Sequence, residues 1–152
     1  MKKKVWRALC MLMALWAFAP CIQAQGKLEE RIKVGDDMPT FALKSDVYGN
    51  VETSKLKGKV VLICFFATWC PPCQLELADV QSRLYPKYKD DANFRLIVIG
   101  RAHTDEQLSA YNEKKKFSFP LYPDPQGNAF KLFANTGIPR SYLFGKDGKL
   151  VK

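Results

Sequence analysis

Two cysteines placed three positions apart carry the most specific chemistry in this sequence. Cys70 and Cys73 enclose two prolines in the segment WCPPC, residues 69–73. Prolines cost no hydrogen bond in the first turn of a helix, so the segment predicts a helix that begins at the pair. The free amides and the positive end of the helix dipole stabilise a thiolate there, lowering an exposed thiol's pKa from roughly 8.5 to between about 3.5 and 7.5. The pattern predicts a redox-active dithiol in which exposed Cys70 is the nucleophile and the more buried Cys73 resolves the mixed disulfide.

The sequence lacks the further ligands that a metal site would need around this pair. A structural zinc site takes four cysteine or histidine ligands, but His103 is the only histidine and Cys64 falls in the middle of a predicted strand. We therefore expect no metal and no cofactor other than the Cys70–Cys73 disulfide. A copper-binding module that adds His103 to the thiolates is an alternative, although we expect this histidine to lie in a surface loop.

Alternating strand and helix patterns surround the dithiol and must position it. Residues 60–66 form a continuous, partly β-branched apolar run, as expected of a central strand buried on both faces. Thr104, with Gln107 three residues later, predicts a capped helix start. This order of elements predicts parallel strand pairing in an α/β domain. The expected elements are an amino-terminal hairpin from residue 38 with its turn at 49–50, strands at 60–66, 94–100 and 139–144, helices at 70–85, 104–115 and 128–133, and a final hairpin through 146–151.

The first 24 residues have the pattern of a secretory signal peptide. A cationic start precedes an apolar stretch of about fifteen residues, shorter than the roughly 20 that cross a bilayer. We predict cleavage after Ala24, a lead-in or linker at 25–37 and a folded domain at 38–152. An uncleaved anchor and a lipoprotein cut before Cys21 are the alternatives. Cleavage leaves three cysteines, which suits one close pair plus a buried thiol.

The formal charge of +9 does not indicate a nucleic-acid partner. Four of the 24 basic residues fall in the predicted signal peptide, which leaves 20 against 15 acidic residues. The remaining basic residues are scattered among acidic ones and form no stripe, so we expect an ordinary solvated surface.

Several short motifs accompany the dithiol along the chain: LKGK at 56–59, FFATW at 65–69, CPPC at 70–73, Glu76, GIP at 137–139 and the Asp147-Gly148 turn. With these motifs the sequence resembles the TlpA/ResA-type thioredoxin-like proteins over nearly the whole mature chain. This resemblance implies a thioredoxin-like α/β fold with an amino-terminal hairpin and a central mixed sheet flanked by helices. Such domains follow the last hairpin with a helix, so with the sequence ending at Lys152 the final helix is expected to be missing.

The same resemblance assigns roles to further residues. Pro139 would be a cis proline packed against the cysteines, and the Ile138 backbone would hydrogen-bond an extended substrate. Trp69 would shield the edge of the site, and Glu76 would handle protons during exchange. Cys64 occupies the place of a buried acid in ordinary thioredoxins, and we expect it to be a small core side chain.

The resemblance implies an exported thiol-disulfide oxidoreductase of the periplasm or cell envelope. Its partners would be proteins that carry dithiols or disulfides, such as apocytochromes, with a membrane electron-donor protein keeping it reduced. Membrane attachment through the amino terminus is possible on this interpretation. A peroxiredoxin-like peroxidase is the alternative enzyme, but its threonine three residues before the cysteine is replaced by Ala67.

Overall fold

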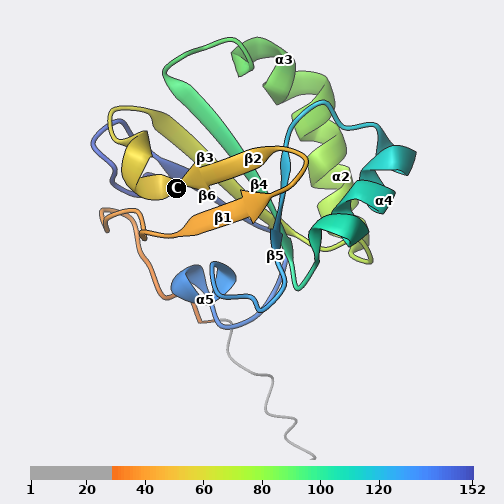
Figure 1. The fold of residues 1–152 in the computed structure, drawn as a ribbon. Helices are drawn as coiled ribbons and strands as arrows, with labels where there is room; N and C mark the ends of the chain where they lie inside the picture. Colours follow the sequence, from red (N-terminus) through yellow and green to blue (C-terminus); the bar gives the residue numbers. More distant parts are fainter. Residues whose placement is uncertain (1–28) are drawn as a thin grey trace, which may run out of the picture.

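A computed structural model describes residues 29–152, so the predicted signal peptide and the start of the lead-in lie outside the described residues. Within that range, no helix is long and apolar enough to cross a membrane. Figure 1 shows the chain path. The strands are β1 (Ala42–Ser45), β2 (Gly49–Glu52), β3 (Val60–Phe66), β4 (Phe94–Arg101), β5 (Leu121–Asp124) and β6 (Arg140–Phe144), and the helices are η1 (Thr53–Leu56), α2 (Pro71–Asp79), η2 (Val80–Leu84), α3 (Tyr85–Tyr88), α4 (Asp105–Lys115) and α5 (Phe130–Phe133).

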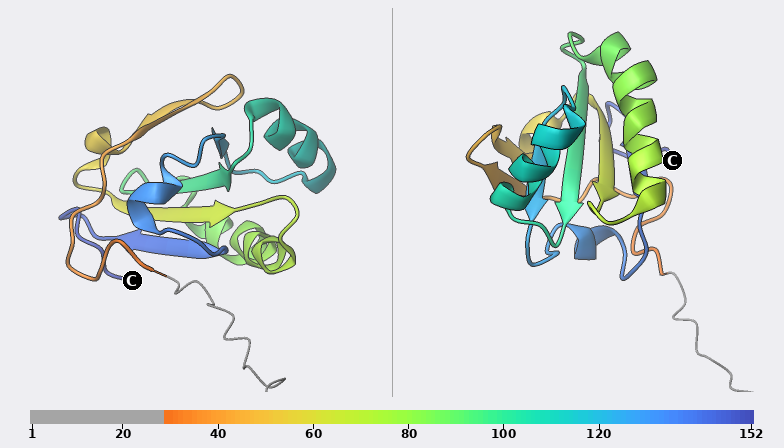
Figure 2. Two further views of the ribbon diagram at one scale, coloured as in Figure 1. Left: turned by 90° about the horizontal axis from the view of Figure 1, so that it is seen from below. Right: turned by 90° about the vertical axis from the view of Figure 1, so that its right-hand side faces the viewer.

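The central sheet has four strands in the order β5-β4-β3-β6, and β1 and β2 form a separate antiparallel hairpin. Strand β3 pairs parallel to β4 and antiparallel to β6, and β4 pairs parallel to β5. This confirms the mixed sheet and the hairpin. The chain crosses from β3 through α2 to β4, and from β4 through α4 to β5, so both crossovers move toward the β5 edge of the sheet. Because such crossovers between parallel strands are right-handed, α2 and α4 cover the same face of the sheet. In Figure 2, α2 and α3 form one column on the opposite side of the sheet from the β1–β2 hairpin.

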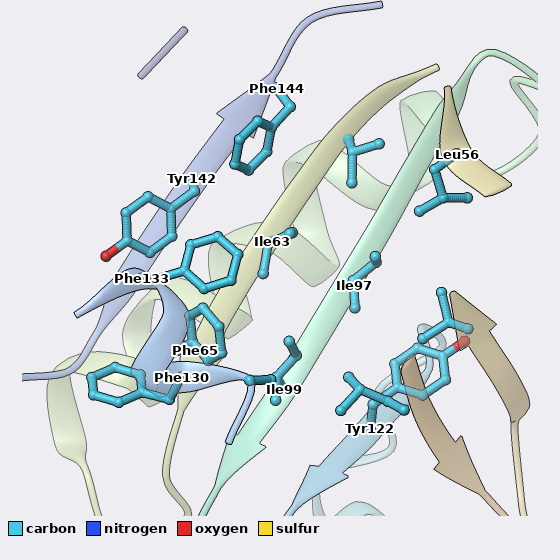
Figure 3. Close-up of a cluster of buried hydrophobic side chains, with 14 of the residues drawn as sticks. Leu56, Ile63, Phe65, Ile97, Ile99, Tyr122, Phe130, Phe133, Tyr142 and Phe144 are labelled. Carbon is cyan, nitrogen blue, oxygen red and sulfur yellow. The ribbon is translucent and has the colours of Figure 1, made fainter. Parts of the chain in front are cut away.

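The face under the hairpin and α5, the aromatic face, is filled with apolar side chains. Phe65 points into it from β3, with its ring centroid 5.3 Å from that of Phe130 and 5.1 Å from that of Phe133. Figure 3 shows these rings with Ile63, Ile97 and Tyr122 around them. Leu43, Val51 and Leu56 close the cluster from the hairpin and η1. This face is therefore an apolar core to which both the start and the end of the described domain contribute.

The opposite face, under α2 and α4, is the dithiol face. Cys64 and Phe66 of β3 point into it and meet Cys73 and Leu77 of α2 and Leu108 of α4. Strand β3 thus alternates between the two faces, as a strand with two buried sides must. Gly100 makes room for α4, since a Cβ there would lie 2.5 Å from the Leu108 side chain.

The dithiol face stays open beside β6. A hollow of about 610 Å³ lies there, with walls that include Leu62, Leu84, Tyr88 and Leu143. After β6 the chain turns, and Leu150 bridges Phe144 in the expected hairpin. Among the described residues, no helix follows β6 to cover this hollow.

Three elements differ from the sequence expectations. The helix at the dithiol continues past Tyr85 to Tyr88 through the π-helical segment η2. Strand β5 was not expected, because prolines flank and interrupt it; it is an edge strand, where a proline is tolerated. The lead-in is not a loose linker over its described part. Glu30 bridges Ala134, and Asp37 bridges Lys149.

Candidate active site

Cys70 and Cys73 form a disulfide at the start of α2, with their Cα atoms 5.3 Å apart. Cys70 is the N-cap of the helix, and the backbone amide of Cys73 donates to its Sγ at 3.3 Å. An amide aimed at this sulfur stabilises a thiolate there when the disulfide is reduced. Cys70 is less exposed than expected, at 5%, but Cys73 is completely buried. The order of accessibility thus matches the sequence expectation, although the first cysteine is not freely exposed.

Hydrogen bonds to Thr68 fix the turn before Cys70. Its hydroxyl lies 2.9 Å from Nε2 of His103, and its carbonyl accepts from the Gln74 side chain at 3.0 Å. The amide of Cys70 donates to the carbonyl of Ala67 at 3.1 Å. The expectation that His103 lies in a surface loop is wrong. The residue is only 6% exposed, because its ring points back over Phe66 instead of out from the strand end.

The Ile138–Pro139 peptide bond is cis, as the resemblance implied. Phe65 pairs with Arg140 in the β3–β6 register, so Pro139 lies level with the end of β3, where the chain turns toward Cys70. The Arg140 side chain stabilises the loop that precedes it. Its guanidinium donates to the carbonyls of Thr136 and Gly137.

The lead-in reaches this same loop. Glu30 forms an ion pair with Arg140 and accepts the Tyr142 hydroxyl at 2.7 Å. The amide of Arg31 donates to the carbonyl of Phe133 at 2.8 Å. The sequence predicted only a lead-in or linker here, yet the Glu30 carboxylate and the Arg31 backbone hold the segment that leads into the cis-proline loop.

Glu76 approaches the sheet through a residue that the sequence analysis did not select. The Ser141 hydroxyl donates to the Glu76 carboxylate, and Ser141 pairs with Cys64 across the β3–β6 register. Burial raises the pKa of the Cys64 thiol to about 12, a hydrogen bond with Ser141 partly opposes this, and the negative charge of Glu76 adds to it. Cys64 is buried and outside the disulfide, as expected of a core side chain.

The residues that sequence reasoning missed around the dithiol have one signal in common. Arg140 and Ser141 are polar residues at the start of the otherwise apolar strand β6, and Thr68 follows the buried strand β3 by two positions. A polar side chain that is buried at such a place needs a partner. That rule could have selected Thr68 and Arg140, which are partly buried, but not the exposed Ser141, and it could not have named His103, Glu76 or Glu30 as the partners.

The described residues do not offer a metal site of the usual kind. Between Glu29 and Lys152, no three His, Cys, Asp or Glu side chains are grouped as metal ligands would be. Both ring nitrogens of His103 are engaged, Nδ1 by the Arg101 carbonyl at 2.7 Å and Nε2 by Thr68. In this arrangement His103 has no free nitrogen to add to the cysteine sulfurs.

Comparisons with known proteins agree with this fold and site. Residues 34–152 match the AhpC/TSA family. The thiol-disulfide oxidoreductase ResA of Bacillus cereus is 32% identical over 82% of this chain and 70% of its own length. ResA of Oceanobacillus iheyensis is 28% identical over 96% of this chain and 78% of its own.

Solved structures show the same architecture. The solution structure of a candidate protein disulfide isomerase from Bacteroides thetaiotaomicron has a TM-score of 0.78 and 33% identity, covering 82% of this chain and 80% of that one. A candidate thiol:disulfide interchange protein DsbE from Chlorobium tepidum has a TM-score of 0.69 and 29% identity, with 80% and 84% covered. By sequence and by fold, the chain belongs to the AhpC/TSA family, among the thiol-disulfide oxidoreductases with a thioredoxin-like fold.

Proposed function

We propose that this chain reduces disulfides in exported proteins through the Cys70–Cys73 dithiol. The observation that carries the proposal is the position of Cys70, which caps α2 and receives the Cys73 amide on its sulfur. A thiolate stabilised in this way attacks disulfides at neutral pH. The family membership supports the reaction class, and the direction of electron flow is our own inference.

The exchange proceeds in two steps that balance. The Cys70 thiolate attacks one sulfur of the substrate disulfide, forming a mixed disulfide and releasing a substrate thiolate that takes up a proton. Cys73 then loses its proton and attacks the Cys70 sulfur, which releases the second substrate thiol and leaves Cys70 and Cys73 joined. Two electrons and two protons pass to the substrate, so a donor must return two electrons before the next cycle.

Four further residues have proposed roles in this reaction. Glu76 would take the proton that Cys73 releases, since the Ser141 hydroxyl holds its carboxylate next to the dithiol face. Trp69 is 70% exposed beside Cys70, where it can contact a substrate. Ile138 and Pro139 lie directly before the first residue of β6, and we propose that the Ile138 backbone pairs with an extended substrate segment in the manner of an added strand, beside Pro139.

We further propose that the chain works in the periplasm or cell envelope, after cleavage at Ala24 or held there by an uncleaved anchor or a lipid on Cys21. Protein disulfides form and persist mainly in oxidising compartments, so substrates for such an enzyme are most abundant there. A membrane electron donor and apocytochrome substrates would complete this role. Mass measurement of the protein in envelope fractions distinguishes the three forms of the amino terminus.

The reduction potential of the Cys70–Cys73 pair tests the proposed direction. The oxidised fraction is measured across a glutathione or dithiothreitol series, with Cys70→Ser as the control. A value near about −270 mV, as in thioredoxin, supports a reductant, and a value near about −120 mV identifies a disulfide-forming oxidant and overturns the proposal. Turnover of peroxide by the reduced protein without a disulfide substrate would point instead to a peroxidase.

A further inference from the structure

His103 is fixed in one tautomer by its surroundings. The Arg101 carbonyl lies 2.7 Å from Nδ1. A carbonyl oxygen can only accept, so the Nδ1 atom carries a proton. The Thr68 amide can only donate and points to Nε2 at 3.4 Å, so Nε2 is an acceptor and the Thr68 hydroxyl donates to it at 2.9 Å.

The backbone is bent to bring this ring inward. Ala102, directly before His103, has a φ of 58°, in the left-handed region that residues other than glycine rarely adopt. The ring then stacks on Phe66, with an interplanar angle of 17°. Strained residues persist only where the surroundings enforce them, and they cluster at functional sites. The conformation at Ala102 is independent of the hydrogen bonds and points to the same ring.

Side chains of α2 and α4 fix the carbonyl group of Thr68. Gln74 donates its amide to the Thr68 carbonyl at 3.0 Å and accepts Lys115 Nζ at 2.7 Å. Thr68 is thus hydrogen-bonded both to His103, just after β4, and to Gln74 in the first turn of α2. Two residues later the chain reaches Cys70, whose backbone conformation sets where its sulfur lies relative to the Cys73 amide.

We infer that His103 is a positioning residue of the dithiol site, which acts through Thr68 to hold the Cys70 sulfur against the amides at the start of α2. Without the ring, the Thr68 hydroxyl and amide lose their common acceptor and the turn loosens. The Cys70 thiolate then receives a poorer hydrogen bond, so the pKa of Cys70 rises. This inference deepens the proposed function, and its test does not require a substrate.

The test follows the alkylation rate of Cys70 against pH in reduced full-length protein, for His103→Ala, Thr68→Val and the double variant. Each single change should raise the pKa of Cys70 and slow alkylation at pH 7 by about three- to tenfold, the effect of weakening one hydrogen bond. The double variant should be no slower than the slower single variant, because both remove the same contact. His103→Gln should recover most of the rate, since its amide oxygen can accept from Thr68.

Tyr111→Phe is the matched control. Like His103, Tyr111 packs against Phe66, and its buried hydroxyl has no partner among the described residues. This variant should leave the pKa of Cys70 unchanged. An unchanged Cys70 pH profile in Thr68→Val overturns the inference, as does a double variant in which the two effects add fully.

A loss of unfolding free energy in His103→Ala with the Cys70 profile intact would identify His103 as a purely structural residue. If His103→Ala does not fold, Thr68→Val and His103→Gln decide the question. A wild-type protein that fails to reduce disulfides would refute the proposed function and leave this test in place.

Discussion

The two faces of the central sheet divide stability from chemistry. The aromatic face is closed and contains apolar side chains from β3, β6, α5 and the hairpin. The dithiol face contains Cys64, Cys70 and Cys73, borders the polar pairs that hold the site, and stays open beside β6. Strands β3 and β4 each supply both faces through alternate residues. The difference teaches that a continuous apolar run can still carry a functional division, because successive side chains leave a strand on opposite sides.

The largest expected effect is a loss of stability from a substitution in the aromatic face that leaves the dithiol face unchanged. Phe144 is fully buried in the aromatic face, so Phe144→Ala should lower the free energy of unfolding by about 3–5 kcal/mol. Denaturant titration measures this loss, and the alkylation rate of Cys70 in the folded protein should not change. If Phe144→Ala alters that rate, the faces are not independent. Phe144→Leu serves if the alanine variant does not fold.

A second prediction concerns the thiol buried in the dithiol face. The pKa of Cys64 is raised from 9.0 to about 12 by burial, so above pH 9 the unfolded chain loses this proton while the folded chain keeps it. The contribution of Cys64 to stability is therefore complete below pH 9 and disappears as the pH rises toward 12. At pH 10 the loss is about 1 kcal/mol.

Comparison with Cys64→Ala isolates this titration from that of the tyrosines and lysines. The difference in unfolding free energy between the oxidised wild type and the variant should shrink steadily between pH 9 and pH 10.5. A constant difference over that interval would mean that Cys64 is not as desolvated as the structure indicates.

A third prediction concerns the ion pair that ties the lead-in to the cis-proline loop. Glu30 is half exposed, whereas Arg140 is only 12% exposed, so Glu30→Gln leaves a largely buried guanidinium without its counter-charge. We expect a loss of about 1 kcal/mol, with faster amide hydrogen exchange at Gly137 and Ile138. Glu52→Gln, which breaks a surface pair with Lys55, is the matched control and should do neither.

The smallest effect is expected at Leu143, the neighbour of Phe144 on the open side of β6. It lines the hollow and is only partly buried, so Leu143→Ala should lower the free energy of unfolding by less than about 1 kcal/mol. The same denaturant titration compares the two variants. A loss as large as that of Phe144→Ala would show that the dithiol face is packed as firmly as the aromatic one.

Local patterns predicted the elements that position the dithiol. The run at 60–66 is β3, Thr104 caps α4 with Gln107 in a capping box, and the prolines after Cys70 begin α2. The elements that were missed depend on distant partners. Strand β5 exists because β4 offers it a parallel edge. The helix passes Tyr85 because the Tyr85 amide bonds to Val80, a π-type step just before Pro86, which has no amide to donate.

The parts of the candidate site that depend on residues close together in the sequence could be predicted. Cys70 and Cys73 follow from their spacing, and the cis bond at Pro139 followed from the resemblance alone. The contacts of His103 and Glu30 could not be predicted. The local sequence around a histidine after a strand, or a glutamate in a lead-in, is the same whether the side chain faces solvent or a partner. Only the fold brings Thr68 to the first and Arg140 to the second.

The complete burial of Cys73 has a consequence for the lifetime of the substrate complex. On the proposed mechanism, only Cys73 resolves the mixed disulfide from within, and external thiols must reach the bond through a site where Cys70 itself is 5% exposed. Cys73→Ser should therefore hold a captured substrate covalently through purification, while Cys70→Ser captures none. Mass spectrometry of the trapped adducts would identify the substrates.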